Sequence, residues 1–176
     1  LEFAVNANIL NREVKWDAGA QISTNKNKVL DLAGGSDILS PGVEIPFYST
    51  TKIARVGQPF GVFYGYEEDG LTDNGLIKYK DTNGDGAISA ADRVVLGSPY
   101  PDLIYGFNTN LSYKNFGLNI FLDGVYGNKI FWATAGTQLN SFQRGQNQFA
   151  DIYGNYWTEE NPDPNAKYPK ISSATV

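Results

Sequence analysis

Apolar and polar residues alternate along four segments of about ten residues each, and this pattern constrains the fold more than any other feature of the chain. The apolar residues of the first two segments are Leu1, Phe3, Val5, Ala7 and Ile9, then Val14, Trp16, Ala18, Ala20 and Ile22. A period of two is the side-chain period of a β-strand, because successive side chains point to opposite faces. The sequence therefore predicts an all-β fold built on two antiparallel hairpins, residues 1–22 and 103–126.

Two short polar turns set the expected register, one at residues 11–12 and the other at residues 114–115. The predicted opposite pairs of the first hairpin are Ile9–Val14, Ala7–Trp16, Val5–Ala18, Phe3–Ala20 and Leu1–Ile22. Those of the second are Tyr113–Phe116, Leu111–Leu118, Thr109–Ile120 and Phe107–Leu122. Each hairpin then carries one apolar face. The other face of the second hairpin carries Asn108, Asn110, Asn119 and Asp123.

The length of the strands separates two classes of protein. Strands of soluble sheets usually have about five or six residues, whereas a tilted strand that crosses a bilayer needs roughly nine to eleven. Alternation alone favours a soluble sheet, because the sequence signal of each transmembrane strand is weak. The connections favour a transmembrane barrel. Such barrels have short turns on the periplasmic side and long loops on the extracellular side. Here two short turns flank one long connection, residues 23–102. We therefore expect residues 23–102 and a second long segment, residues 127–176, to be ordered extracellular loops.

A twelve-residue run inside the first long segment has the layout of a calcium loop. Ca²⁺ is bound by six to eight oxygen ligands, and the chain must turn sharply to supply them from alternate residues. Gly86, at position 6, permits that turn. The expected ligands are the side chains of Asp81, Asn83 and Asp85, the carbonyl of Ala87, the hydroxyl or a bridging water of Ser89, and the carboxylate of Asp92. Ile88 is expected to point inward and anchor the loop.

Two features distinguish this loop from an EF-hand sensor. Asp92 is shorter than the usual bidentate Glu, which predicts weaker coordination. No helices flank the loop, because residues 76–80 alternate like a strand and Gly97 with Pro99 ends any helix after it. A structural ion is thus expected, whereas the alternative is that Asn83-Gly84 and Asp85-Gly86 are simply turn dipeptides.

Composition excludes several functions. The chain has no Cys and no His, so disulfides, thiolate or histidine metal sites and a Ser-His-Asp triad are impossible. The formal net charge of −5 argues against a nucleic-acid partner. No apolar run approaches the roughly 20 residues of a membrane helix, and no signal peptide opens the chain, so we expect Leu1 to lie inside a longer protein. Paired-carboxylate hydrolysis remains open on composition alone, but we expect a chain that is not an enzyme.

Aromatic residues are the other candidates for a functional site. Trp132, Tyr153, Tyr156 and Trp157 lie among polar residues in the second long segment. Their rings could stack on a sugar or a partner protein, and the alternative is ordinary packing or an interfacial aromatic belt. The aromatic and glycine run at residues 60–66 predicts a short strand within the first long segment.

Several motifs follow one another in the order of a known family. They are VGQPFGVFYGY at 56–66, IKYKDTNGDG at 77–86, GSPYP at 97–101, YG at 105–106, GN at 127–128, YWT at 156–158 and AKYP at 166–169. The chain thereby resembles the C-terminal part of the barrel in SusC/RagA-type TonB-linked outer-membrane transporters. The resemblance implies a bacterial outer-membrane location and a 22-stranded barrel. It also implies a SusD-type surface lipoprotein as a lid, TonB as energy coupler, and import of glycan or peptide oligomers.

Four strands are too few to close a barrel, since about eight is the smallest number. Outside a membrane, the apolar faces of the two hairpins must therefore be buried in some other way. We expect the hairpins to curl into two layers, to be covered by the long segments, or to pair with a second copy through exposed edges. The rival to a barrel fragment is a soluble secreted β-module that binds calcium and carbohydrate.

Overall fold

The computed structural model describes residues 1–40, 51–134 and 147–171. It divides into two compact units, each made of two stretches of the chain. The first unit contains Leu1–Phe63 and Gly97–Lys129, and the second contains Tyr64–Leu96 and Ile130–Val176. The long strands lie in the first unit, whereas the predicted calcium loop and the aromatic candidates lie in the second.

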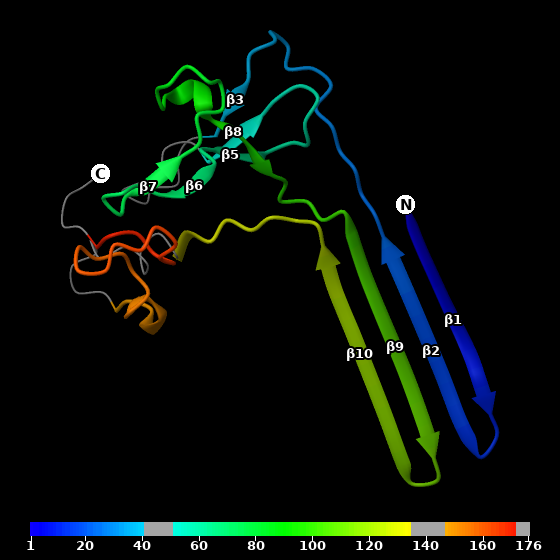
Figure 1. The fold of residues 1–176 in the computed structure, drawn as a ribbon. Coiled ribbons are helices and arrows are strands. Elements are labelled where there is room, and N and C mark those ends of the chain that lie inside the picture. The colour runs from blue at the N-terminus through cyan, green and yellow to red at the C-terminus, as the bar shows by residue number, and fades with distance from the viewer. Residues whose placement is uncertain (41–50, 135–146, 172–176) are drawn as a thin grey trace. The chain divides into compact units, whose positions relative to one another are not determined.

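Four long strands form a single antiparallel sheet in the first unit (Figure 1). They are β1 (Glu2–Asn11), β2 (Val14–Ser23), β9 (Leu103–Tyr113) and β10 (Phe116–Tyr126). Their lengths of 10, 10, 11 and 11 residues are those predicted from the alternation. The order is β1-β2-β9-β10, so the two hairpins join edge to edge through β2 and β9.

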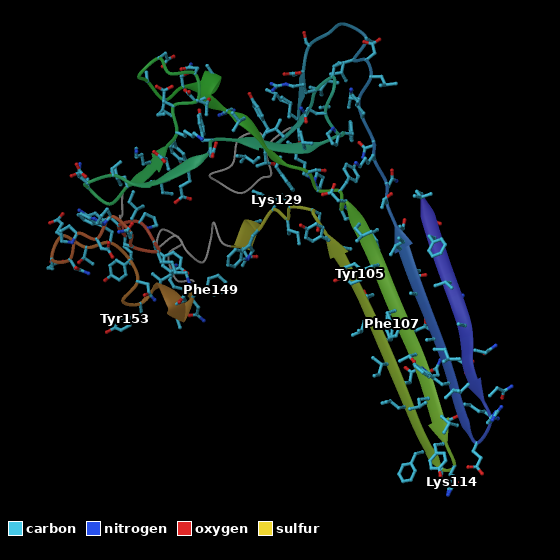
Figure 2. All side chains as sticks on the ribbon, turned by 45° about the vertical axis from the view of Figure 1, so that its right-hand side comes forward. Tyr105, Phe107, Lys114, Lys129, Phe149 and Tyr153 are labelled. Carbon is cyan, nitrogen blue, oxygen red and sulfur yellow. The ribbon has the colours of Figure 1, made fainter. Side chains whose placement is uncertain are left out.

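The second hairpin has the predicted register. Tyr113 lies opposite Phe116 and Leu111 opposite Leu118, and the pairing continues without a break to Leu103 and Tyr126. The turn at residues 114–115 is tight, with Lys114 at φ 54° and at the tip of the hairpin (Figure 2). Turn chemistry and hydrophobic pattern agree here on one alignment.

The predicted register of the first hairpin is wrong by two residues. Phe3 pairs with Ile22 and not with Ala20, because the turn lies at residues 12–13 and not at 11–12. A shift of two leaves every side chain on the same face, so alternation cannot distinguish the two alignments. The structure also contains a bulge between Asn8 and Leu10, which brings Leu10 opposite Trp16 on the apolar face.

Pairing of β2 with β9 continues the apolar face across all four strands. Ala20 lies opposite Phe107 and Trp16 opposite Leu111. The face is exposed along its length: Val5 is 49%, Phe107 40% and Leu122 58% exposed. The expectation of a two-layer arrangement is therefore wrong, since the sheet is one layer, whereas cover by the long segments stays a prediction. Pairing with a second copy stays a prediction.

The shorter strands form two small sheets. One has the order β3 (Ile38–Leu39), β4 (Lys52–Ala54), β5 (Val62–Gly65) and β8 (Val94–Gly97), and the other pairs β6 (Glu68–Leu71) with β7 (Ile77–Tyr79). β5 is the strand predicted within residues 60–66. Ile53 and Val62 face each other across β4 and β5, each only 1% exposed, and form the centre of a small core.

Among the described residues, two single-turn 3-10 helices, η1 (Ala90–Asp92) and η2 (Ala150–Ile152), lie in the second unit. The first closes the predicted calcium loop. The second lies in residues 147–171, which dock on the turn between β6 and β7 through a backbone bond from Lys170 N to Gly75 O, 2.7 Å. Within the three described ranges, no helix is long and apolar enough to cross a membrane.

Candidate functional site

The acidic loop, residues 81–92, is held closed by its own carboxylate and amide oxygens. Both oxygens of Asp81 accept backbone N–H groups, one from Gly84 at 2.7 Å and the other from Gly86 at 2.8 Å. Asn83 Oδ1 accepts from the amide of Asp85, and Asp85 Oδ1 accepts from the amide two residues further on, each at 2.8 Å. These bonds draw the side chains at positions 1, 3 and 5 around one turn, in which Gly84 and Gly86 have φ values of 75° and 84°.

Asp92 closes the loop from the other end. Its side chain is fully buried, at 0% exposure. One carboxylate oxygen accepts from the amides of Thr82 at 2.9 Å and Asn83 at 3.4 Å, and the other accepts from the amide of Ser89 at 2.8 Å. The Ser89 amide, followed by those of Thr82 and Asn83, lowers the pKa of Asp92 against the opposing effect of burial. Asp92 is therefore a charged clasp between the two arms of the loop.

The remaining predicted ligands have other surroundings. Ser89 Oγ accepts from the amide of Ala91 at 3.2 Å and caps η1, as part of a capping box with Asp92. Ile88 is 47% exposed, so the expectation that it anchors the loop is wrong; without a paired helix there is no core for it to enter. As the side chains of the described residues stand, no three His, Cys, Asp or Glu residues are gathered into a metal site.

Three side chains that the sequence analysis missed close the base of the loop. Tyr79 lies just before the loop and Arg93 directly after it, and both contact Tyr66. The rings of Tyr66 and Tyr79 have centroids 5.3 Å apart, and the Arg93 guanidinium lies 5.2 Å from the centroid of Tyr66. An aromatic residue before the loop and an arginine directly after it are the signal that could have found this stack.

The four aromatic candidates do not share one environment. Trp157 is only 5% exposed and packs inside the second unit, which matches the packing alternative. Tyr156 is half-buried and bridges to Tyr168. Trp132, 59% exposed, has its ring centroid 5.7 Å from that of Phe149. Tyr153 is 90% exposed and free for contact with a ligand or partner (Figure 2).

A charged network fixes the fold of residues 151–168. Asp151 accepts hydrogen bonds from Lys167 Nζ and, at 2.6 Å, from the hydroxyl of Tyr168. The bond from Lys167, followed by that from Tyr168, lowers the pKa of Asp151. The carboxylate in turn raises the pKa of Lys167 and of Tyr168. All three groups are outside the long strands.

The length of the four strands and the single apolar face of their sheet are typical of a β-barrel of the outer membrane. No family model matches the chain, but curated relatives do. Two TonB-dependent receptors of Formosa agariphila are 37% and 33% identical to it, over 92% and 99% of the chain. The TonB-dependent receptor SusC of Bacteroides thetaiotaomicron is 28% identical over 80% of the chain.

The chain therefore corresponds to a part of a SusC-type TonB-dependent receptor, as the motifs predicted. It spans 18%, 19% and 15% of the length of these three relatives. Its all-β fold with antiparallel sheets agrees with a fragment of such a barrel. The predicted outer-membrane location is confirmed by the class of the relatives, and so is the prediction that the chain is not an enzyme, because TonB-dependent receptors are transporters.

Proposed function

We propose that the chain is the wall and outer-loop region of a TonB-driven importer of glycan or peptide oligomers. The observation that supports this is the four-strand sheet, in which one face stays apolar from β1 to β10 over strands long enough to cross a bilayer. In this proposal residues 23–102 and 127–176 lie outside the cell. TonB supplies the energy, and a SusD-like surface lipoprotein closes the mouth.

Uptake by cells tests the proposal. A strain lacking the receptor that contains this segment would be offered a panel of labelled oligosaccharides and oligopeptides. We expect the uptake of one class to be lost, and to return with the intact receptor but not with a receptor whose TonB contact is deleted. Unchanged uptake of every member of the panel, together with secretion of the protein in soluble form, would support the calcium-binding β-module instead.

We also propose that residues 81–92 bind a structural Ca²⁺. The donor chemistry supports a hard cation, because Asp81, Asn83 and Asp85 present oxygen atoms around one turn. Carboxylate oxygens that accept a single N–H retain a lone pair for a metal. The Ala87 carbonyl, Ser89 and Asp92 complete the proposed ligand set. Asp92 would bind the ion directly only by giving up some of its N–H partners.

Calorimetry with Ca²⁺ tests the metal proposal. Asp85→Ala removes one of the carboxylates of the turn, and Asp73→Ala, an acidic residue outside the loop, is the matched control. We expect the heat of binding to be lost in the first variant and kept in the second. Equal heats in the wild type and in Asp85→Ala would remove the site.

A further inference from the structure

The turn between β6 and β7 is covered by a tryptophan from a segment about eighty residues away in the sequence. Trp157 is 5% exposed, and a Cβ at Gly75 would lie 2.6 Å from Trp157 Cγ, closer than real Cβ contacts. The ammonium of Lys170 lies 5.5 Å from the centroid of the Trp157 ring. Lys170 N also donates to Gly75 O at 2.7 Å. We call Gly75, Trp157 and Lys170 the tryptophan clasp.

Glycine is required at position 75 for two reasons. Its φ of 74° lies in the left-handed region, and its bare Cα leaves the space that the indole fills. Gly70 provides a comparison, because its φ is 83° and a Cβ there would meet nothing within 4 Å. Of these two glycines, Gly75 alone combines a left-handed backbone conformation with close packing.

Apart from the tryptophan clasp, the hairpin of β6 and β7 is held by its own hydrogen bonds and by two exposed ion pairs, Lys78 with Asp69 and Lys80 with Glu67. Exposed ion pairs contribute little to stability. The hairpin is a two-stranded sheet with an irregular register, and Ile77 and Tyr79 on β7 are 40% and 41% exposed. A two-stranded hairpin is marginally stable in water unless another element packs on it. Trp157 supplies such packing at the turn, so the order of β7 depends on the clasp.

Strand β7 leads directly into the acidic loop. Tyr79 is its last residue and part of the stack with Tyr66 and Arg93 that closes the base of the loop. The turn at one end of β7 is thus held by the clasp, and the residues at the other end set the positions of Asp81 and Asp92.

We propose that Trp157 is a positioning residue for the loop: the clasp holds β7, and β7 holds the base of residues 81–92. Its consequence for calcium affinity rests on the proposed metal site, whereas its consequence for the order of the loop does not. None of the three clasp residues belongs to the loop. The segment 147–171 therefore affects the order of the loop without being part of it.

Hydrogen exchange in the purified full-length receptor, without calcium, tests the order of the loop. Trp157→Ala is compared with Tyr153→Ala, which removes an exposed ring from the same segment. We expect faster exchange over residues 76–93 in the first variant only. Because the loss of a large buried side chain could unfold the segment, Gly75→Ala repeats the test from the hairpin side, with Gly70→Ala as its control. Gly75→Ala should speed exchange in both residues 76–93 and residues 147–171, and Gly70→Ala should leave residues 147–171 unchanged.

Calorimetry on the same variants tests whether the tryptophan clasp affects the affinity for Ca²⁺. We expect Trp157→Ala to weaken the binding of Ca²⁺ by about fivefold or more, as is typical of coupled sites. If residues 147–171 loosen but exchange over residues 76–93 does not change, the proposal is overturned. If the wild type binds no Ca²⁺, the metal proposal fails. The hydrogen-exchange result alone then decides whether the tryptophan clasp orders the loop.

Discussion

Trp16 Nε1 donates a hydrogen bond to Thr109 Oγ1 at 2.8 Å, and this bond links the two hairpins across the apolar face. The hydroxyl of Thr109 in turn donates a hydrogen bond to the backbone carbonyl of Asp17 at 3.1 Å. The indole N–H thus has an acceptor, and the hydroxyl has both a donor and an acceptor, on a face made mostly of apolar side chains. In a bilayer no water replaces a missing partner.

Thr109→Val should therefore leave the Trp16 N–H without an acceptor while it keeps the shape of the side chain. We expect a loss of about 1–3 kcal/mol in the free energy of unfolding. Thr109→Ser keeps the hydroxyl and is the control. Urea unfolding of the receptor in lipid vesicles measures both. Equal stability of the two variants would show that the bond contributes nothing.

A second contact on this face is between Tyr105 and Gly124, on β9 and β10. A Cβ at Gly124 would lie 2.6 Å from Tyr105 Cζ, whereas a Cβ at Gly117 would meet nothing within 4 Å. Gly124→Val should displace the ring and cost about 1–3 kcal/mol of stability. Gly117→Val, on the same strand, should cost less. The temperature at which each receptor unfolds in detergent gives the comparison, and equal temperatures would argue against ring packing on Gly124.

Much of the barrel segment could be predicted, because strand length and alternation reflect the pleat and the thickness of the membrane. The register of the second hairpin followed from its tight turn at Lys114. The first hairpin was misaligned because a shift of two preserves both faces, and no local signal marked the bulge near Leu10. The two-layer arrangement expected for the hairpins was wrong because the strands pair into one open sheet.

The second unit was harder to predict, because its contacts join residues far apart in sequence. The layout of residues 81–92 was visible, but the burial of Asp92 depends on the amides of Thr82 and Asn83 that reach it from the other arm. Trp157 could not be separated from Tyr153 by sequence, since both lie among polar residues. In the structure Trp157 is buried because it fills the space beside the bare Cα of Gly75, whereas Tyr153 stays exposed.

Asp92 should order the loop even without an ion. In Asp92→Asn the amide nitrogen that replaces one carboxylate oxygen cannot accept the N–H groups bonded there. We expect faster hydrogen exchange over residues 81–92 in calcium-free buffer. Asp85→Asn, at an exposed position of the same loop, should change this exchange less. An effect of Asp92→Asn that appears only when calcium is present would contradict the role of Asp92 as a clasp.

The network of Asp151, Lys167 and Tyr168 predicts a pH window. The lowered pKa of Asp151 contributes stability above its unfolded value, about 3.9, and this is lost as the pH falls through the lower folded value. The raised pKa of Tyr168 contributes stability below about 10, which is lost as the pH rises through the folded value. Lys167 has the same sign as Tyr168.

NMR signals of a labelled Tyr168 side chain should therefore stay constant between these limits and shift beyond each of them. In Asp151→Asn we expect the acid transition to vanish and the alkaline one to move down in pH. An acid transition that persists in this variant would assign it to another group.

We propose that this segment crosses the outer membrane with its long connections outside the cell and its short turns on the periplasmic side. The segment contains no cysteine, so single cysteines can be placed at Asp73 in the first long connection, at Asn115 in the turn, and at Leu118 on the apolar face. A membrane-impermeant maleimide would be added to intact and to permeabilised cells. We expect Asp73→Cys to be labelled in intact cells, Asn115→Cys only after permeabilisation, and Leu118→Cys in neither. Labelling of Asn115→Cys in intact cells, or of Asp73→Cys only after permeabilisation, would contradict it.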